Sequence, residues 1–279
     1  MLPQELQKLA ADFPYLMALS LVLVCLGIAI HQDRVRFFRF VRPLEPREPP
    51  LWGWAEILLC LSFWCLMQVM FGGMSAALFP KSLAAATFFA HVNSTIFTCA
   101  LAVHLIHGRL GQPIASLGLG GTSLRNVPPT LLFCAVNVLP IQAVAVAWVL
   151  LLGLVFGFKP ESQALVVLFE ESAERQDVFS MALLVLSGVL VAPVGEEILL
   201  RGMVFGQASA RWGPTAGALV SSVLFSLCHF SVMAFFPLIL VGCILCYVYR
   251  RTGSLYPSML YHAAFNGLAF AQIFLKEPS

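Results

Sequence analysis

The sequence has little charge. Only 11% of its 279 residues are Asp, Glu, Lys or Arg, whereas a soluble globular domain has about 25%. Hydrophobic residues make up 59% of the chain, and the mean hydropathy is +0.88. The net charge is only +2, and no basic patch with interleaved aromatic residues is present, so nothing indicates a nucleic-acid partner. The composition therefore predicts an integral membrane protein.

Several other signatures are also missing. All eight cysteines lie inside apolar segments, which argues against a secreted disulfide framework. The one CxxC pair, Cys243 and Cys246, has no second pair to complete a metal site, and we interpret both as small packing residues. No HExxH zinc motif, internal repeat or low-complexity tract occurs. We therefore expect residues 1–279 to form a single integral membrane domain.

Long apolar runs give the fold class. They predict about eight transmembrane helices, and hence an all-α polytopic membrane helix bundle. The segments are 14–30, 52–71, 83–106, 128–158, 179–206, 214–231, 235–249 and 254–275. Pro140 predicts a kink or tilt in the fourth segment. The acidic connection 159–178 has the length for a short surface helix, with a solvated loop as the alternative.

The cationic residues alternate between the two faces of the predicted bundle. Ten of the sixteen Lys and Arg residues lie in the even-numbered connections, such as 31–50 and 107–127, and five lie on the other face. The remaining one, Arg201, lies within a predicted span. The positive-inside rule then places the arginine-rich connections in the cytoplasm and both termini outside.

A few polar residues interrupt the last four segments, where a charge costs a few kcal/mol or more. They are Glu196, Glu197, Arg201, His229, His262 and Asn266. At about 1.5 Å of rise per residue, Glu196 and His229 lie roughly 20–25 Å from the turn near 211–214, and His262 lies roughly 15 Å from the turn near 250–253. Three helices thus bring these side chains to similar depths, which predicts a polar active or binding centre.

Spacing suggests how this centre divides its roles. Glu197 and Arg201 are four residues apart and can pair on one helical face. Glu196 is turned about 100° away without such a partner, which suits a general base. His262 and Asn266 are also four apart and would offer two hydrogen-bond donors to one point, as an oxyanion stabiliser requires. Purely structural roles are the alternative for each, because polar residues also join membrane helices.

Three ordered motifs carry a family resemblance. The segment GEEILLRG fits EExxxR, FSLCH fits FxxxH from Phe225 to His229, and HAAFN fits HxxxN. In these motifs the chain resembles the CPBP family, the type II CAAX prenyl proteases and their bacteriocin-processing relatives. Residues 179–275 would be the core that carries the motifs, and Leu200 replaces the usual Phe before the motif arginine. The resemblance implies an intramembrane endopeptidase whose helices surround a cavity open to the cytoplasm and the bilayer.

The resemblance also implies roles for single residues. Glu196 with His229 would hold and activate a water, His262 and Asn266 would stabilise the oxyanion, and Glu197 with Arg201 would support them. The family is often described as metalloproteases, and Glu196, His229 and His262 could form a zinc-binding set with an open fourth position. Water activation by a glutamate and a histidine needs no metal, and we favour that mechanism while zinc stays open.

The implied partners are membrane lipids and a peptide or lipid-modified protein substrate. The sequence around the motifs is similar to that of bacterial family members, which implies a multi-pass protein of the bacterial inner membrane. A catalytically silent scaffold or a bacteriocin self-immunity protein is the alternative function. A proton-relaying transporter fits less well, because the polar residues have no counterpart in an earlier repeat.

Overall fold

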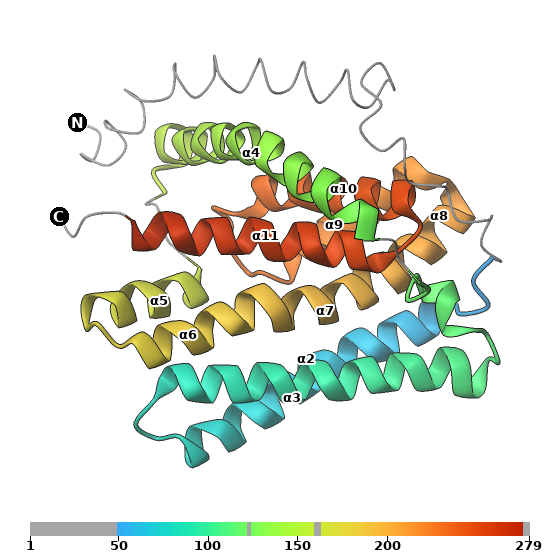
Figure 1. The fold of residues 1–279 in the computed structure, drawn as a ribbon, viewed down its shortest axis with the longest axis horizontal. Coiled ribbons are helices and arrows are strands. Elements are labelled where there is room, and N and C mark those ends of the chain that lie inside the picture. Colours follow the sequence, from blue (N-terminus) through green and yellow to red (C-terminus); the bar gives the residue numbers. More distant parts are fainter. Residues whose placement is uncertain (1–48, 122–123, 159–162, 276–279) are drawn as a thin grey trace.

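The computed structural model describes residues 49–121, 124–158 and 163–275 (Figure 1). Within these ranges the chain is helical and has no strand, which confirms the predicted all-α class. The predicted first span, 14–30, lies outside the described residues, as does nearly all of the arginine-rich connection that follows it.

The helices follow the predicted apolar segments closely. They are α2 (Trp54–Leu78), α3 (Leu83–Val103), α4 (Val127–Phe156), α5 (Ala164–Glu174), α6 (Val178–Leu186), α7 (Ala192–Glu196), α8 (Gly206–Trp212), α9 (Pro214–Leu227), α10 (Phe235–Thr252) and α11 (Leu255–Phe274). The π-helical segments η4 (Ser187–Val191) and η5 (Glu197–Phe205) join α6, α7 and α8 into one long helix. A further π-helix, η1 (His104–Arg109), extends α3.

Five helical stretches of the described chain are long and apolar enough to cross a membrane. They are Trp54–Leu78, Leu83–Arg109, Leu124–Phe156, Val178–Trp212 and Phe235–Thr252. The protein is therefore a multi-pass integral membrane protein. The 20-residue α11 is not among the five, and it carries polar residues that include His262 and Asn266.

One predicted helix is shorter in the structure than in the sequence prediction, and one open alternative is resolved. The segment 214–231 is not helical throughout, because α9 ends at Leu227 after 14 residues and the chain turns before α10 begins. His229 therefore lies in the α9–α10 connection and not on a helix. The acidic connection after α4 does contain a short helix, α5, so the surface-helix interpretation holds over the solvated loop.

Local sequence explains where several helices begin and end. The Ser82 and Ser254 hydroxyls accept hydrogen bonds from backbone N–H groups in the first turns of α3 and α11. Gly157 and Gly253 follow α4 and α10 with left-handed backbone angles (φ 68° and 66°), which glycine adopts without steric cost. These signals place the turns between spans.

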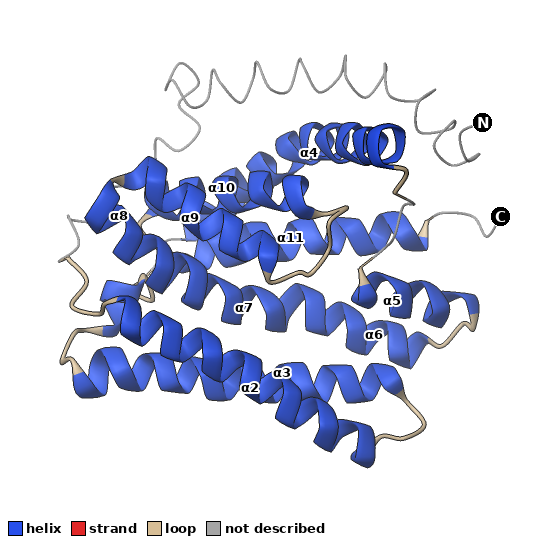
Figure 2. Cartoon of the chain, turned by 180° about the vertical axis from the view of Figure 1, so that it is seen from behind, coloured by secondary structure: helices blue, strands red, loops and turns tan. Residues whose placement is uncertain are grey.

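The helices lie side by side along the long axis of the molecule (Figure 1). The α2–α3 pair forms one side, the α6–α8 helix and α11 form the middle, and α9, α10 and α4 lie beyond them, as the reverse view also shows (Figure 2). The main hydrophobic core joins these groups through buried residues such as Ile106, Leu200 and Leu245. The long central helix thus has neighbours on both sides, and it carries the EExxxR motif.

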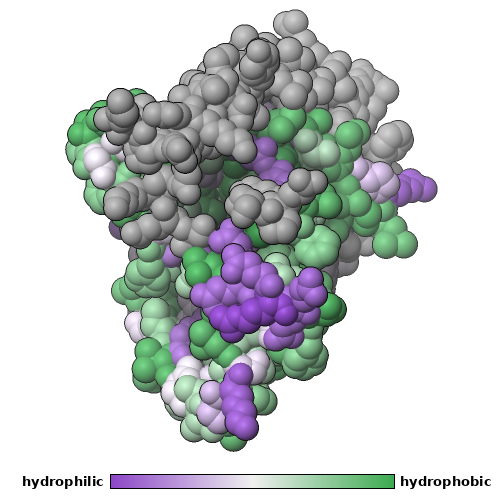
Figure 3. All heavy atoms as spheres, turned by 90° about the vertical axis from the view of Figure 1, so that its left-hand side faces the viewer, coloured by the Kyte–Doolittle hydropathy of each residue, from purple (hydrophilic) through white to green (hydrophobic). Residues whose placement is uncertain are grey.

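Charged residues are exposed near both ends of the bundle. Figure 3 views the end where α5 joins α6, and hydrophilic residues gather on it between hydrophobic flanks. The exposed residues at the end of α5 and in the α5–α6 connection include Glu174, Arg175 and Asp177. The arginines that end α8 and α10, Arg211 and Arg250, are exposed near the opposite end.

Candidate active site

The carboxylate of Glu197 is the most heavily hydrogen-bonded group of the site. Arg201 Nη1 donates to Glu197 Oε1 at 3.0 Å, and the Ser258 hydroxyl donates to Oε2 at 2.5 Å. His262 Nδ1 lies 3.1 Å from Oε1 and must donate, because an ionised carboxylate only accepts. Glu197 and Arg201 are both fully buried. The i,i+4 pair predicted from the sequence is present, and it reaches α11 through two further residues.

Arg201 has a second set of partners beyond Glu197. Its guanidinium lies over the ring of Phe225, 4.5 Å from the centroid, and Nη2 donates to the backbone oxygen of Gly242 at 3.4 Å. The first contact ties the central helix to α9 and the second ties it to α10. A cation on an aromatic face is stabilised further when both are desolvated. The pair therefore fixes the relative positions of four helical elements.

Glu196 is buried like its neighbour Glu197, but it lacks the hydrogen-bond partners that Glu197 has. It ends α7 with 8% of its surface exposed, and its Oε2 is buried without a hydrogen-bond partner among the described residues. The nearest cationic candidate is His262, whose Nε2 lies 3.9 Å from Oε2, beyond hydrogen-bonding distance. The hydrogen-bonded carboxylate of Glu197 thus lies next to the carboxylate of Glu196, which can still accept a hydrogen bond.

One ring nitrogen of His229 is hydrogen-bonded to the backbone, and the other stays available as an acceptor. Its Nδ1 lies 2.7 Å from the carbonyl oxygen of Phe225, which can only accept, so Nδ1 carries a proton. The ring also packs edge-on against Phe225, with centroids 4.7 Å apart. In the neutral imidazole Nε2 is therefore the acceptor. This orientation is typical of a histidine held to act as a base.

The two polar residues of the HxxxN motif have different partners. His262 Nδ1 is engaged with Glu197, and Asn266 Nδ2 donates to the carbonyl oxygen of Gly188 at 2.8 Å. The two donors that we expected at one point are thus directed to two different acceptors. Asn266 retains its second amide N–H for another acceptor, because its NH₂ group has two donors.

These side chains border two adjoining cavities of about 250 and 390 Å³. Glu196 and His229 line both, and His262 with Asn266 lines the smaller one. Irregular backbone at membrane depth is tolerated where it is buried in protein or lines a water-filled cavity. The connection that carries His229 fits this rule, since Cys228 and His229 form part of the wall of the larger cavity.

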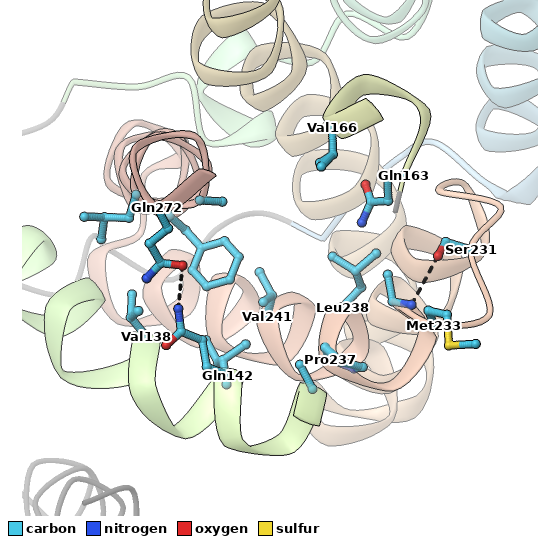
Figure 4. Close-up of a pocket in the computed structure, with 16 residues that line it drawn as sticks. Val138, Gln142, Gln163, Val166, Ser231, Met233, Pro237, Leu238, Val241 and Gln272 are labelled. Carbon is cyan, nitrogen blue, oxygen red and sulfur yellow. Dashed lines mark hydrogen bonds between the residues drawn. The ribbon is translucent and has the colours of Figure 1, made fainter. Parts of the chain in front are cut away.

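A third cavity, of about 330 Å³, continues the smaller one between α4, α10 and α11 (Figure 4). The two share wall residues that include Gln163, Leu238 and Phe265. Most of the third cavity's wall is apolar, and a hydrogen bond between Gln142 and Gln272 crosses one side of it. The polar centre therefore opens onto an apolar chamber.

Sequence reasoning missed two residues of this site. Ser258 lies one turn before His262 on α11, so the i,i+4 spacing that linked His262 to Asn266 would have found it. His91 on α3 lines both cavities beside Glu196 and His229. Its signal, a polar residue inside a long apolar run, is the one that singled out the residues of the last four segments.

The predicted zinc ligands are Glu196, His229 and His262. Among the described residues, no three His, Cys, Asp or Glu side chains lie together in a group that could hold a metal ion. Glu196, His229 and His262 do line one cavity, but as placed they do not form a ready three-ligand centre. The zinc site and the metal-free mechanism both stay predictions.

Comparison with known proteins agrees with the motif analysis. The chain matches no curated protein and no solved structure. Residues 178–268 match the family described as type II CAAX prenyl endopeptidase, Rce1-like, and this segment contains all three motifs. The match supports the resemblance to the CPBP proteases, and it covers about one third of the chain, so residues 178–268 are similar to the Rce1-like type II CAAX prenyl endopeptidase family.

Proposed function

We propose that this protein is an intramembrane endopeptidase in which Glu196 and His229 activate a water to hydrolyse a peptide bond. The observation that carries the proposal is the buried Oε2 of Glu196, which has no partner among the described residues and borders a cavity shared with His229. A buried acceptor without a partner is costly. A water bound there would satisfy it and would be held close to a base.

The proposed reaction balances on these residues. Glu196 accepts a proton as the water oxygen bonds to the peptide carbonyl carbon, and the carbonyl oxygen becomes an oxyanion. His229 Nε2 accepts a hydrogen bond from the same water and orients it. As the C–N bond breaks, the proton held by Glu196 passes to the leaving nitrogen, which restores the carboxylate.

Glu197 and Arg201 would act by position. The carboxylate of Glu197 holds His262 through Nδ1, so the ring is fixed with Nε2 toward Glu196. Arg201 supports this arrangement and braces Phe225 under His229. Asn266, with one N–H free, and His262 lie on the proposed oxyanion side of the cavity. A constellation locked by such contacts needs little reorganisation during the reaction.

The apolar chamber next to the site suggests the kind of substrate. A peptide with an apolar or lipid-modified tail would place the tail in the chamber of about 330 Å³ and its scissile bond beside Glu196. Membrane lipids would surround the bundle. We propose that cleavage occurs near the cytoplasmic side, where the positive-inside rule places the arginine-rich ends, and that the host membrane is a bacterial inner membrane.

The first test compares the wild type with Glu196→Gln in liposomes against a mixed peptide library. The substitution keeps the shape of the side chain and removes its basicity, so cleavage should vanish. Glu171→Gln is the matched control, because Glu171 is a glutamate on α5 that lies outside the cavities and is largely exposed. Both variants should elute and unfold like the wild type.

The same assay addresses the metal and the alternative function. A chelator that abolishes wild-type cleavage, with recovery on added zinc, would support a metal held by Glu196, His229 and His262. If the wild type cleaves nothing while folded Glu196→Gln still supports the cellular phenotype of the gene, the protease proposal is wrong and the scaffold or immunity function takes its place.

A further inference from the structure

His91 lies where a fourth helix meets the candidate active site. It belongs to α3, which the three family motifs do not include. Four residues on, Thr95 meets Gly195, where an added Cβ would lie 3.0 Å from Thr95 Cγ2. The missing side chain at Gly195 therefore lets α3 approach α7 directly beside Glu196. The approach brings His91 into the walls of both cavities with Glu196 and His229.

A buried serine determines which nitrogen of His91 carries the proton. His91 Nδ1 lies 2.6 Å from the hydroxyl oxygen of Ser187, which is fully buried. In the part of the chain that the structure describes, Ser187 has no other side-chain hydrogen bond. If Nδ1 were the donor, the buried hydroxyl proton would have no acceptor, which is unfavourable. The hydroxyl therefore donates to Nδ1, and neutral His91 carries its proton on Nε2.

The two histidines that line both cavities are thus fixed in opposite tautomers. His229 has its proton on Nδ1, held by the Phe225 carbonyl, and offers an acceptor at Nε2. His91 offers a donor at Nε2, which has no hydrogen-bond partner among the described residues. An acceptor suits the attacking water, whereas a neutral N–H donor suits the oxygen on which negative charge develops.

The HxxxN residues leave this role incomplete. His262 donates its Nδ1 proton in the hydrogen bond to Glu197, so the neutral ring has no second N–H to donate. Asn266 donates one amide N–H to the carbonyl oxygen of Gly188, the residue after Ser187. We infer that His91 is a catalytic residue whose Nε2–H donates a hydrogen bond to the oxyanion formed from the scissile carbonyl. This inference rests on the proposed peptidase function, and it requires no proton transfer by His91.

The experiment uses a peptide that the wild type cleaves, in two forms. One form has the normal scissile amide and the other has a thioamide, whose sulfur is a weaker hydrogen-bond acceptor. The variants are His91→Phe, which removes the donor, and His91→Gln, whose side-chain amide can place an N–H near the position of Nε2. His104→Phe is the control, because His104 lies on the exposed end of the same helical span.

His91→Phe should lower kcat on the amide by roughly 10²–10³-fold, the usual effect of losing one oxyanion donor, with little change in KM. Its loss on the thioamide should be clearly smaller, and His91→Gln should recover much of the activity. A merely structural role would slow both peptides equally. Equal losses, or a Gln variant as slow as the Phe variant, would overturn the inference while leaving the protease intact. A wild type that hydrolyses neither form, or any other library peptide, would overturn the proposed function and the inference together.

Discussion

The buried pair Glu197–Arg201 and the surface pair Glu171–Arg175 make a natural comparison. Both are glutamate–arginine pairs four residues apart, with N–O distances of 3.0 and 3.2 Å. The first pair is completely buried, whereas the side chains of Arg175 and Glu171 are 74% and 49% exposed. We predict that Arg201→Met destabilises the protein strongly and that Arg175→Met hardly changes its stability.

The magnitude follows from what each substitution leaves behind. Removing one partner of a buried ion pair costs about 3–5 kcal/mol, because the other charge stays buried and uncompensated. Here Ser258 and His262 still donate to Glu197, which favours the lower end of that range, while the lost contact with Phe225 adds about 0.5–2 kcal/mol. The exposed pair is worth about 0.2–1 kcal/mol.

The assay is thermal unfolding in detergent, followed through the exposure of buried cysteines. At about 2–4 °C per kcal/mol, Arg201→Met should lower the midpoint by roughly 6–20 °C and Arg175→Met by less than about 4 °C. The double variant Glu197→Gln/Arg201→Met should regain much of the loss, because it leaves no unpaired charge. Equal shifts for the two single variants, or a double variant worse than Arg201→Met, would refute the reasoning.

Two further predictions concern the packing and capping of the helices. An added Cβ at Gly242 would lie 2.8 Å from the Cα of Ser222, so Gly242→Ala should push α9 away from α10. We expect this substitution to lower the free energy of unfolding by about 1–3 kcal/mol and to reduce peptide cleavage. The control is Gly72→Ala, whose new Cβ would have nothing within 4 Å and which should be neutral or slightly stabilising in the same unfolding assay. Hydrogen bonds from the Ser180 hydroxyl and backbone N–H hold the pKa of the Asp177 carboxyl below its ordinary value. Its stabilising contribution should therefore be present above the unfolded pKa of about 3.9 and be lost as the pH falls through the lower folded pKa. Asp177→Asn keeps a capping side chain and should show a flatter unfolding midpoint between pH 6 and pH 2.5, and an unchanged slope would contradict the assignment.

Local spacing predicted the parts of the site that depend on one helix. The pairing of Glu197 with Arg201 follows from an i,i+4 interval, which survives in the π-helical segment η5. Counting from the turns also predicted similar depths for Glu196 and His262, and Glu196 Oε2 and His262 Nε2 lie 3.9 Å apart. The apolar runs predicted the helices because a membrane-spanning helix consists of consecutive apolar residues, so its length can be counted directly in the sequence.

The parts that depend on tertiary packing could not be predicted in this way. His91 reaches the cavities because α3 packs against α7 at Gly195, and no interval in the sequence records that approach. The partner of Asn266 is a backbone carbonyl, which every residue possesses, so its choice of Gly188 has no sequence signal. The π-helical segments are likewise invisible, because a change of hydrogen-bond register leaves the composition unaltered.

The ring of Phe225 touches three members of the site. It lies beneath the Arg201 guanidinium at 4.5 Å and contacts the rings of His229 and His262 edge-on at 4.7 and 5.5 Å. Residues that share a partner in this way show interaction energies in double-mutant cycles. The effects of substitutions at Arg201, His229 and His262 should therefore not add, and a Phe225 variant would remove the part of their mutual dependence that passes through this ring, while Arg201 and His262 stay coupled through Glu197. A single apolar side chain thus couples these three polar residues energetically.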